Sequence, residues 1–365
     1  MVSFAKPRGV ICFTNPQQLE FIKKNGVYGN VDTGDTTTKT SGQAISKAKQ
    51  IRFGKIADLL SVIPGDIVFL FERDASKLHG VWKITSQPFF STKPIFDPNN
   101  AYPYRFNIEV YLDFPSPIPV MELRKLLNQN LIWSIRTFER ESQATFASIN
   151  PISIEETEAI TDVFYRYNHR INPHQNPVAY HKNPLKEQVN YHDLVMNDIH
   201  TAIDNLEIEA INLGKTPKPV ILEEALHAFL TYNLVRSTPE MRRMFGEYRQ
   251  VLREVPISVA GQHRVDLLLI YENEITHTPT VYSLVEVKRD AVTIDRLRQL
   301  LEYIKLFSER HHIDSNSVEG IYIGRSFEED AEGYIKNRAK IESERPVRLI
   351  NYKIDGNSIL LTNKL

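Results

Sequence analysis

The stretch Val281-Tyr282-Ser283-Leu284-Val285-Glu286-Val287-Lys288 is an apolar run that ends in an acidic, an apolar and a basic residue. Such a run predicts a buried strand, whose side chains point alternately to its two faces. Glu286 and Lys288 therefore lie on one face, and Val287 packs on the other. No other Asp or Glu of the chain is followed two residues later by a lysine. This strand decides how the second half of the chain is interpreted.

A second apolar run, Arg264 to Ile270, precedes this strand and contains a single acidic residue, Asp266. If the two strands are neighbours, Asp266 and Glu286 share one edge of the sheet. Two carboxylates offer the oxygen ligands that Mg²⁺ prefers, and the ion polarises a phosphate and lowers the pKa of a bound water. A nearby lysine can orient that water and offset negative charge. These residue types favour phosphodiester hydrolysis; the competing interpretation is a strand end with a surface salt bridge.

The composition is that of a soluble globular protein. The 365 residues suggest two domains, and 42% hydrophobic residues are enough for real cores. One cysteine, Cys12, excludes an internal disulfide framework and a thiolate zinc cluster. Neither a signal-peptide pattern nor a membrane-spanning run is present, so we expect a soluble protein from a reducing compartment.

The net charge of −1 hides an asymmetry between the two halves of the chain. Residues 1–150 contain 18 basic and 13 acidic residues, and the remaining residues include 26 basic and 32 acidic ones. The mildly basic first part suits contact with a polyanion. The acidic second part needs a metal ion to handle phosphates, because bare carboxylates repel them.

Residues 187–365 mix helical and strand patterns, which predicts an α/β core with helices flanking a sheet. Helical spacing covers Tyr191–Leu213 and Val220–Leu234. The other expected elements are strands at 249–257, 264–271, 281–287, 320–323 and 347–353 and helices at 295–307 and 328–340. His311 and His312 follow as a helix end, where cationic or polar residues are expected.

Residues 1–165 combine short apolar runs with turn-rich loops. The expected strands are 9–13, 66–71, 80–84 and 106–112, and the expected helices are 121–128 and 153–165. Ser153 and Glu156 form a capping-box pattern at the second helix. A basic run from Lys39 to Lys55, also holding Lys47, Lys49 and Arg52, lies in a Thr-, Ser- and Gly-rich stretch that we expect to be a mobile loop. Residues 166–186, rich in Pro, Asn and His, are expected to form a linker.

Two further features extend the pattern around Asp266 and Glu286. Gln299 and Tyr303 are four residues apart on the expected helix and so share a face. Upstream, Glu223 and Glu224 begin another helix. The order Glu, Asp, Glu-x-Lys, Gln-x-x-x-Tyr resembles the RecB-like branch of the PD-(D/E)XK nuclease superfamily. Segments 247–249, 264–268 and 285–289 resemble in particular the mismatch-endonuclease (NucS-type) nuclease domain, and the resemblance covers residues 190–325.

That resemblance implies a role for each matching residue. Asp266 and Glu286 would be metal ligands, and Lys288 would assist the nucleophilic water. Glu223 would be an additional acidic ligand, with Glu224 as the alternative. Gln299 and Tyr303 would brace the site or touch DNA. The implied cofactor is Mg²⁺, with Mn²⁺ able to substitute; ordinary surface polarity of these helices is the competing interpretation.

The first part of the chain resembles the YTH/EVE group of the PUA-like superfamily, mainly in the order and spacing of its segments over residues 9–165. The segments that carry the likeness are 65–71, 80–86, 105–110 and 140–143. The resemblance implies a PUA-like β-barrel with helices, in which an aromatic cage holds a modified base flipped out of a duplex.

In such a cage, Tyr28 and Tyr102 would occupy the two tryptophan positions. Trp82 is a further candidate, although a place in the buried core is the favoured interpretation of this tryptophan. Tyrosine in place of tryptophan departs from methyladenine readers and leaves a modified cytosine open. The residues expected to contact the nucleic-acid backbone are Arg140, Lys47, Lys49 and Arg52.

Together, the two resemblances predict an α+β protein of two domains. Residues 1–165 would form a reader domain, which binds a modified base, and residues 187–365 would form a nuclease domain. The predicted activity is modification-dependent restriction of double-stranded DNA in a prokaryotic cytoplasm, without a membrane. One active site per chain favours a homodimer. The alternatives are a mismatch- or structure-specific repair endonuclease, a nucleic-acid-binding reader with an inactive nuclease fold, and an RNA-directed reader.

Overall fold

The computed structural model divides into two compact units, Met1–Ile203 and Asp204–Leu365. The residues that it describes are 7–30, 42–91, 96, 102–135, 148–171, 223–257, 263–273, 275–276, 278–341, 347–355 and 358–364. The expected helix Tyr191–Leu213 lies outside them. Within these ranges, no helix is long and apolar enough to span a membrane.

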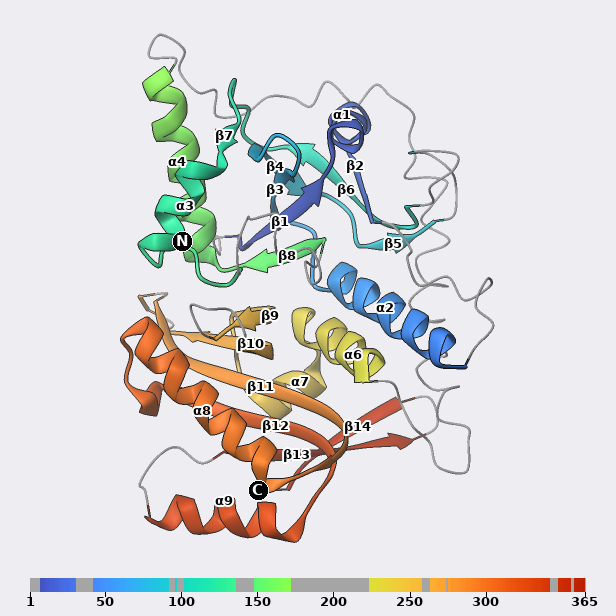
Figure 1. The fold of residues 1–365 in the computed structure, drawn as a ribbon, viewed down its shortest axis with the longest axis vertical. Coiled ribbons are helices and arrows are strands. Elements are labelled where there is room, and N and C mark those ends of the chain that lie inside the picture. Colours follow the sequence, from blue (N-terminus) through green and yellow to red (C-terminus); the bar gives the residue numbers. More distant parts are fainter. Residues whose placement is uncertain are drawn as a thin grey trace. The chain divides into compact units, whose positions relative to one another are not determined.

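The second unit is built on a sheet in which the strands follow the order β14-β13-β12-β11-β10-β9 (Figure 1). The strands are β9 (Gln250–Pro256), β10 (Arg264–Glu272), β11 (Pro279–Val292), β12 (Val318–Phe327), β13 (Arg348–Asp355) and β14 (Ser358–Asn363). Strands β9, β10 and β11 pair antiparallel, whereas β11, β12 and β13 pair parallel. Parallel neighbours need a crossover, and a helix supplies each of the two.

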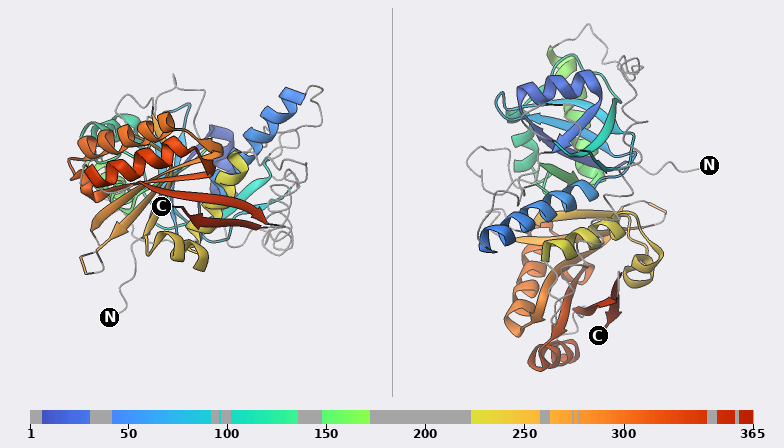
Figure 2. Two further views of the ribbon diagram at one scale, coloured as in Figure 1. Left: turned by 90° about the horizontal axis from the view of Figure 1, so that it is seen from below. Right: turned by 90° about the vertical axis from the view of Figure 1, so that its right-hand side faces the viewer.

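Four helices surround this sheet in the described part of the unit. They are α6 (Glu223–Val235), α7 (Pro239–Phe245), α8 (Ile294–His311) and α9 (Glu329–Ile341). Helix α8 connects β11 to β12 and packs on both, with α9 beside it (Figures 1 and 2). Leu297, Leu300 and Phe307 form its fully buried stripe. A Cβ at Gly320 of β12 would lie 2.9 Å from Ile304, so glycine allows the helix this close approach.

The expected α/β arrangement of the second unit is therefore observed, with shifted boundaries. Strand β11 is longer than the expected 281–287 because pairing with β12 continues to Val292. Val285 and Val287 are fully buried, as are Leu267, Leu268 and Leu269 of β10. Continuous burial of this kind is typical of a strand covered on both faces, and it makes these strands a rigid base for polar side chains at their ends.

The first unit is built on a mixed sheet in which the strands follow the order β2-β6-β4-β3-β1-β8. These strands are β1 (Gly9–Thr14), β2 (Val27–Asn30), β3 (Ile67–Glu72), β4 (Lys77–Ile84), β6 (Tyr104–Val110) and β8 (Ile149–Ile152), with β5 (Phe89–Phe90) on β6 and β7 (Ile118–Pro119) on β4. In the described residues the sheet curls into a half-barrel, and no pairing joins its outer strands β2 and β8, so the expected barrel is seen in part.

The helices of the first unit include two that the sequence did not predict. The helices are α1 (Pro16–Asn25), α2 (Gly42–Leu60), α3 (Val120–Asn128) and α4 (Ile154–Ile171). Helix α1 lies across the strands (Figure 2, right). Helix α2 carries most of the basic run, which corrects the expected mobile loop: Phe53, Ile56 and Leu60 are buried and anchor it. Helix α4 continues past residue 166, into the segment expected to be the linker.

Candidate active site

Three carboxylates lie in a row across β9, β10 and β11. Arg253 pairs with Leu267 and Val255 with Val265, so Glu254 and Asp266 lie opposite each other between those pairs. Leu267 pairs with Val285, which places Asp266 opposite Glu286 at the next position. Asp266 also accepts a hydrogen bond of 2.7 Å from the Val287 backbone N–H. The expectation that Asp266 and Glu286 share one edge of the sheet agrees with this register.

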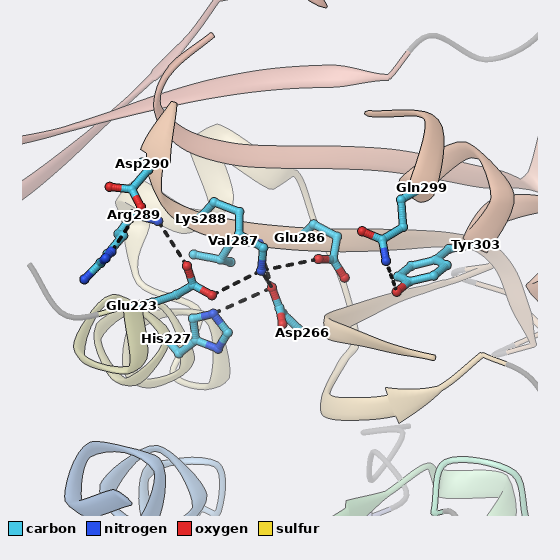
Figure 3. A network of polar contacts seen from close by, with 10 residues as sticks. All are labelled: Glu223, His227, Asp266, Glu286, Val287, Lys288, Arg289, Asp290, Gln299 and Tyr303. Carbon is cyan, nitrogen blue, oxygen red and sulfur yellow. Dashed lines mark hydrogen bonds and ion pairs between the residues drawn. The ribbon is translucent and has the colours of Figure 1, made fainter. Parts of the chain in front are cut away.

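Lys288 connects Glu223, the third expected carboxylate, to Asp266 and Glu286 (Figure 3). Its Nζ lies 3.1 Å from Glu223 Oε1, 3.7 Å from Asp266 Oδ2 and 3.7 Å from Glu286 Oε2. Glu223 stands at the start of α6, and its Oε2 accepts a 3.4 Å hydrogen bond from the Arg289 backbone N–H. Of the two acids that begin α6, the structure therefore places Glu223 against the lysine.

The charges of this cluster alter one another's proton affinities. Burial, and then the negative charge of Asp266, hold the pKa of Glu286 well above its usual range. Burial alone would lower the pKa of Lys288, but Asp266, Glu223 and Glu286 together raise it above its usual value. Lys288 thus stays protonated at neutral pH, which suits donation of hydrogen bonds and not removal of a proton.

The donor atoms of the cluster fit a divalent cation. Glu286 Oε1 and His227 Nε2 are both buried without a hydrogen-bond partner, although buried polar atoms are normally satisfied. His227 lies one turn after Glu223 on α6, and its Nε2 is 3.6 Å from Asp266 Oδ2. The ligand atoms of His227, Glu254 and Asp266 all lie within 4.8 Å of one another. A cation among the ligand atoms of His227, Glu254 and Asp266 would give the imidazole a partner and screen the two carboxylates from one another.

Gln299 and Tyr303 flank the other end of this cluster on α8 (Figure 3). Gln299 Nε2 donates a 2.8 Å hydrogen bond to the Tyr303 hydroxyl. Burial, and then the charges of Glu286 and Asp266, raise the pKa of Tyr303. The Tyr303 hydroxyl is therefore neutral at physiological pH, and the negative charges of the carboxylates act on it. This suits the expected role of Gln299 and Tyr303 in holding the site in place.

Sequence reasoning missed two members of the cluster, His227 and Glu254. The spacing Glu223-x-x-x-His227 was a signal, because residues four apart on a helix share a face. Glu254 gave a weaker signal, as an acidic residue inside the expected strand Val251 to Val255. Its φ of +51° could not be read from the sequence, since left-handed backbone is rare for residues other than glycine.

In the first unit, two of the three expected cage residues belong to the core. Tyr28 is 1% exposed, stacks on Phe106 and donates hydrogen bonds to the carbonyls of Phe13 and Ser148. Trp82 is 7% exposed and covers Gly80, where a Cβ would lie 1.7 Å from its ring. These contacts are those of packing residues: Trp82 lies in the core, which is the interpretation the sequence favoured for it, and the expectation that Tyr28 lines an open pocket is corrected.

Tyr102 is the expected cage residue that remains partly exposed. Its ring centroid lies 5.1 Å from that of Phe96, which lies 4.2 Å from that of Phe21. The guanidinium of Arg105 lies 5.6 Å from the Phe96 ring, and Arg105 Nε donates to the Tyr102 carbonyl. All three aromatic residues are partly exposed, so they form an aromatic surface that the sequence did not single out.

The expected backbone-contacting residues have different outcomes. Arg140 lies outside the described residues, and the side chains of Lys47 and Lys49 on α2 are likewise outside the description. Arg52 Nε donates a 3.2 Å hydrogen bond to the Tyr104 hydroxyl. Lys55 Nζ donates to Ser148 Oγ at 3.0 Å, and burial lowers its pKa. Lys55 therefore serves the packing of α2, and a contact of Arg52 with a nucleic-acid backbone stays a prediction.

Comparison with known proteins assigns no family. No family model and no curated protein matches the chain. A repair endonuclease from Pyrococcus abyssi is 21% identical over 29% of this chain and 41% of its own, with a TM-score of 0.23. The chain thus spans less than half of that endonuclease.

Two further solved structures match a larger share of their own length. A hypothetical protein from Leishmania major is 11% identical over 44% of this chain and 96% of its own, with a TM-score of 0.30. A protein from Pseudomonas putida is 11% identical over 42% of this chain and 98% of its own, with a TM-score of 0.28. All three scores are too low to assign a fold or an activity.

Proposed function

We propose that this protein is a metal-dependent DNA endonuclease with its nuclease centre in the second unit. The observation that carries the proposal is the convergence of Asp266, Glu286 and Glu223 on the Lys288 ammonium, beside a buried Glu286 oxygen without a partner. Two carboxylates that can hold a cation, with a lysine beside them, are groups that can hydrolyse a phosphodiester.

Asp266 and Glu286 would hold the cation, Mg²⁺ or Mn²⁺, and Glu223 would complete the negative environment from α6. When bound, the cation lowers the pKa of a water and screens the phosphate charge. Lys288 is protonated, so its Nζ donates to the attacking water or to a phosphate oxygen and stabilises developing negative charge. The hydrogen bond from the Val287 N–H holds the Asp266 carboxylate in place beside Glu286.

The first unit is proposed to recognise a modified base, which would make the protein a modification-dependent restriction endonuclease. Support comes from the aromatic surface of Phe21, Phe96 and Tyr102, because a flipped base loses its stacking neighbours and needs aromatic faces in their place. Arg105 beside Phe96 adds positive charge near that surface.

A cleavage assay with Mg²⁺ or Mn²⁺ tests both parts. The substrates are matched duplexes with cytosine, methylcytosine, hydroxymethylcytosine, methyladenine or a mismatch. We expect cutting of one modified duplex, a loss of at least about 100-fold in Lys288→Ala, and wild-type rates in Lys305→Ala, an exposed lysine of α8. Tyr102→Ala should lose the preference for the modified duplex, and Tyr111→Ala, an exposed tyrosine elsewhere on this unit, should keep it.

The outcomes separate the alternatives. Cutting that ignores modification would keep the nuclease and reject the reader. Cutting confined to the mismatched duplex would indicate a repair endonuclease. No cutting of any duplex, with Mg²⁺ or Mn²⁺, would overturn the nuclease and leave a nucleic-acid-binding protein.

A further inference from the structure

We propose that Arg296, at the start of α8, binds the DNA phosphate next to the one that is cut. This inference rests on the proposed nuclease function and adds a residue that contacts the substrate. Neither the sequence pattern nor the carboxylate cluster singles out this arginine.

The first support is the place of Arg296 on α8. The helix begins at Ile294, and Arg296 precedes Gln299 by three residues and Tyr303 by seven. Residues at these spacings share one face of a helix. Arg296 therefore extends, toward β11, the polar stripe that Gln299 and Tyr303 form beside the carboxylates (Figure 3).

The second support is the surroundings of Tyr322 on β12. Tyr322 pairs with Glu286 in the parallel register of β11 and β12, so the two side chains leave the sheet on the same face. Burial, and then the negative charge of Glu286, raise the pKa of Tyr322. The positive charges of Lys288 and Arg296 act on the same pKa in the opposite direction. The Arg296 guanidinium therefore lies close enough to the nuclease centre to act on the neighbour of Glu286.

The third support is the state of the Arg296 side chain. It is partly exposed, but its Nη1 is buried and lacks a hydrogen-bond partner. Buried polar atoms are normally paired, and a charged donor that is left unpaired is costly. Guanidinium groups bind phosphates through two parallel hydrogen bonds, so a phosphate that reaches this side chain would pair with the unsatisfied donor.

The charge balance of the centre also favours a phosphate ligand for this residue. Three carboxylates surround the Lys288 ammonium, those of Asp266, Glu286 and Glu223. Lys288 and one divalent cation would together balance their charge and leave no positive charge for the other phosphates of the strand. Arg296 supplies that charge. Because Lys288 already lies among the carboxylates, the Arg296 guanidinium serves the phosphate beside the one that is cut.

The test is single-turnover cleavage, with Mg²⁺, of the duplex that the wild type cuts, with one phosphate at a time replaced by a neutral methylphosphonate. In the wild type, one replacement next to the cut should slow cleavage by about 10- to 100-fold, the worth of a charge-assisted hydrogen bond. Arg296→Gln should be slowed by a similar factor on the all-phosphate duplex and should lose this sensitivity. Arg298→Gln, which removes the same charge from an exposed position on α8, should behave as the wild type.

Urea unfolding of the same variants separates this role from a structural one. Arg296→Gln should unfold at the same or a higher urea concentration than the wild type, because the free protein loses an unpaired buried donor. An arginine that only supports the fold would instead lower this concentration and leave the sensitivity to the methylphosphonate unchanged.

The outcomes distinguish the two proposals. The role of Arg296 would be overturned, and the nuclease proposal left standing, by a wild-type rate in Arg296→Gln or by slower cleavage with full sensitivity at every phosphate. The absence of a sensitive phosphate next to the cut in the wild type would have the same meaning. No cleavage by the wild type would overturn both proposals. If Arg296→Gln fails to fold, Arg296→Lys decides, because it keeps the charge without the paired donors: part of the rate and of the sensitivity is expected, and full wild-type values would overturn the role.

Discussion

At the scale of single residues, Glu254 shows how a strand can bring a side chain to a site at a cost in stability. Its left-handed backbone interrupts β9 where Asp266 lies across from it. Glycine adopts this conformation without a steric penalty, whereas alanine does not. In an ordinary strand position the order is reversed, because glycine loses more entropy on folding.

The conformation of Glu254 predicts an inverted order of stability. Glu254→Gly should be more stable than Glu254→Ala by about 1 kcal/mol in urea unfolding, because only alanine retains the left-handed strain. The same two substitutions at Glu319, in the regularly paired part of β12, should leave the alanine variant equally stable or more stable. Superior stability of Glu254→Ala would mean that the backbone at this position is not left-handed.

His311 illustrates a different effect of burial. At the end of α8 the sequence predicts a cationic or polar residue, and the ring of His311 packs on Phe307 with centroids 4.3 Å apart. Burial, with the charges of Arg310 and His312, lowers the pKa of His311 to about 4 from an ordinary value of 6.5. The folded state therefore favours the neutral ring.

The lowered pKa makes stability depend on pH. Between pH 6.5 and about 4 the unfolded chain binds a proton that the folded chain does not, so stability falls as the pH falls through that window. Denaturant unfolding at pH 7 and pH 4.5 should show a loss that is smaller in His311→Gln by about 1–3 kcal/mol. An equal loss in both proteins would contradict the neutral ring.

At the scale of elements, the start of α4 shows a local motif used for a long-range contact. The predicted capping box forms: Ser153 N–H donates to Glu156 Oε2 at 2.7 Å, and Glu156 N–H donates to Ser153 Oγ at 3.2 Å. The buried Glu156 carboxylate also accepts from the N–H groups of Trp133 and Ser134 and from Ser134 Oγ. It therefore fixes the chain after α3 to the start of α4.

This network predicts different costs for its two halves. Glu156→Gln replaces a carboxylate oxygen with an NH₂ group that faces donors, and it should cost about 3 kcal/mol of unfolding free energy. Ser153→Ala removes only the cap and should cost about 1 kcal/mol. Thermal and urea unfolding measure both. Equal costs would mean that the contacts to Trp133 and Ser134 add nothing beyond the cap.

At the scale of the whole molecule, each unit has its own sheet and its own buried core. The core of the first unit includes Phe69, Phe71 and Phe164, and that of the second includes Leu268, Val285 and Phe307. A unit whose stability comes from its own core can open by itself.

Independent cores predict that damage stays within one unit. Glu156→Gln should speed amide hydrogen exchange in β1, β3 and β8 and leave β10 and β11 at wild-type rates. Mass-spectrometric exchange on the full chain measures both sets in one experiment. Faster exchange in both units would mean that they unfold as one.

The sequence by itself determined those features that depend on neighbours along the chain. Strand alternation placed Glu286 and Lys288 on one face, helical spacing joined Gln299 to Tyr303, and a capping box marked the start of α4. Tertiary structure alone decided what depends on register and packing between distant segments. Pairing of β9 with β10 brought Glu254 to Asp266, and packing of α6 brought His227. Packing of the first sheet buried Tyr28, because the identity of a side chain does not specify which residues will cover it.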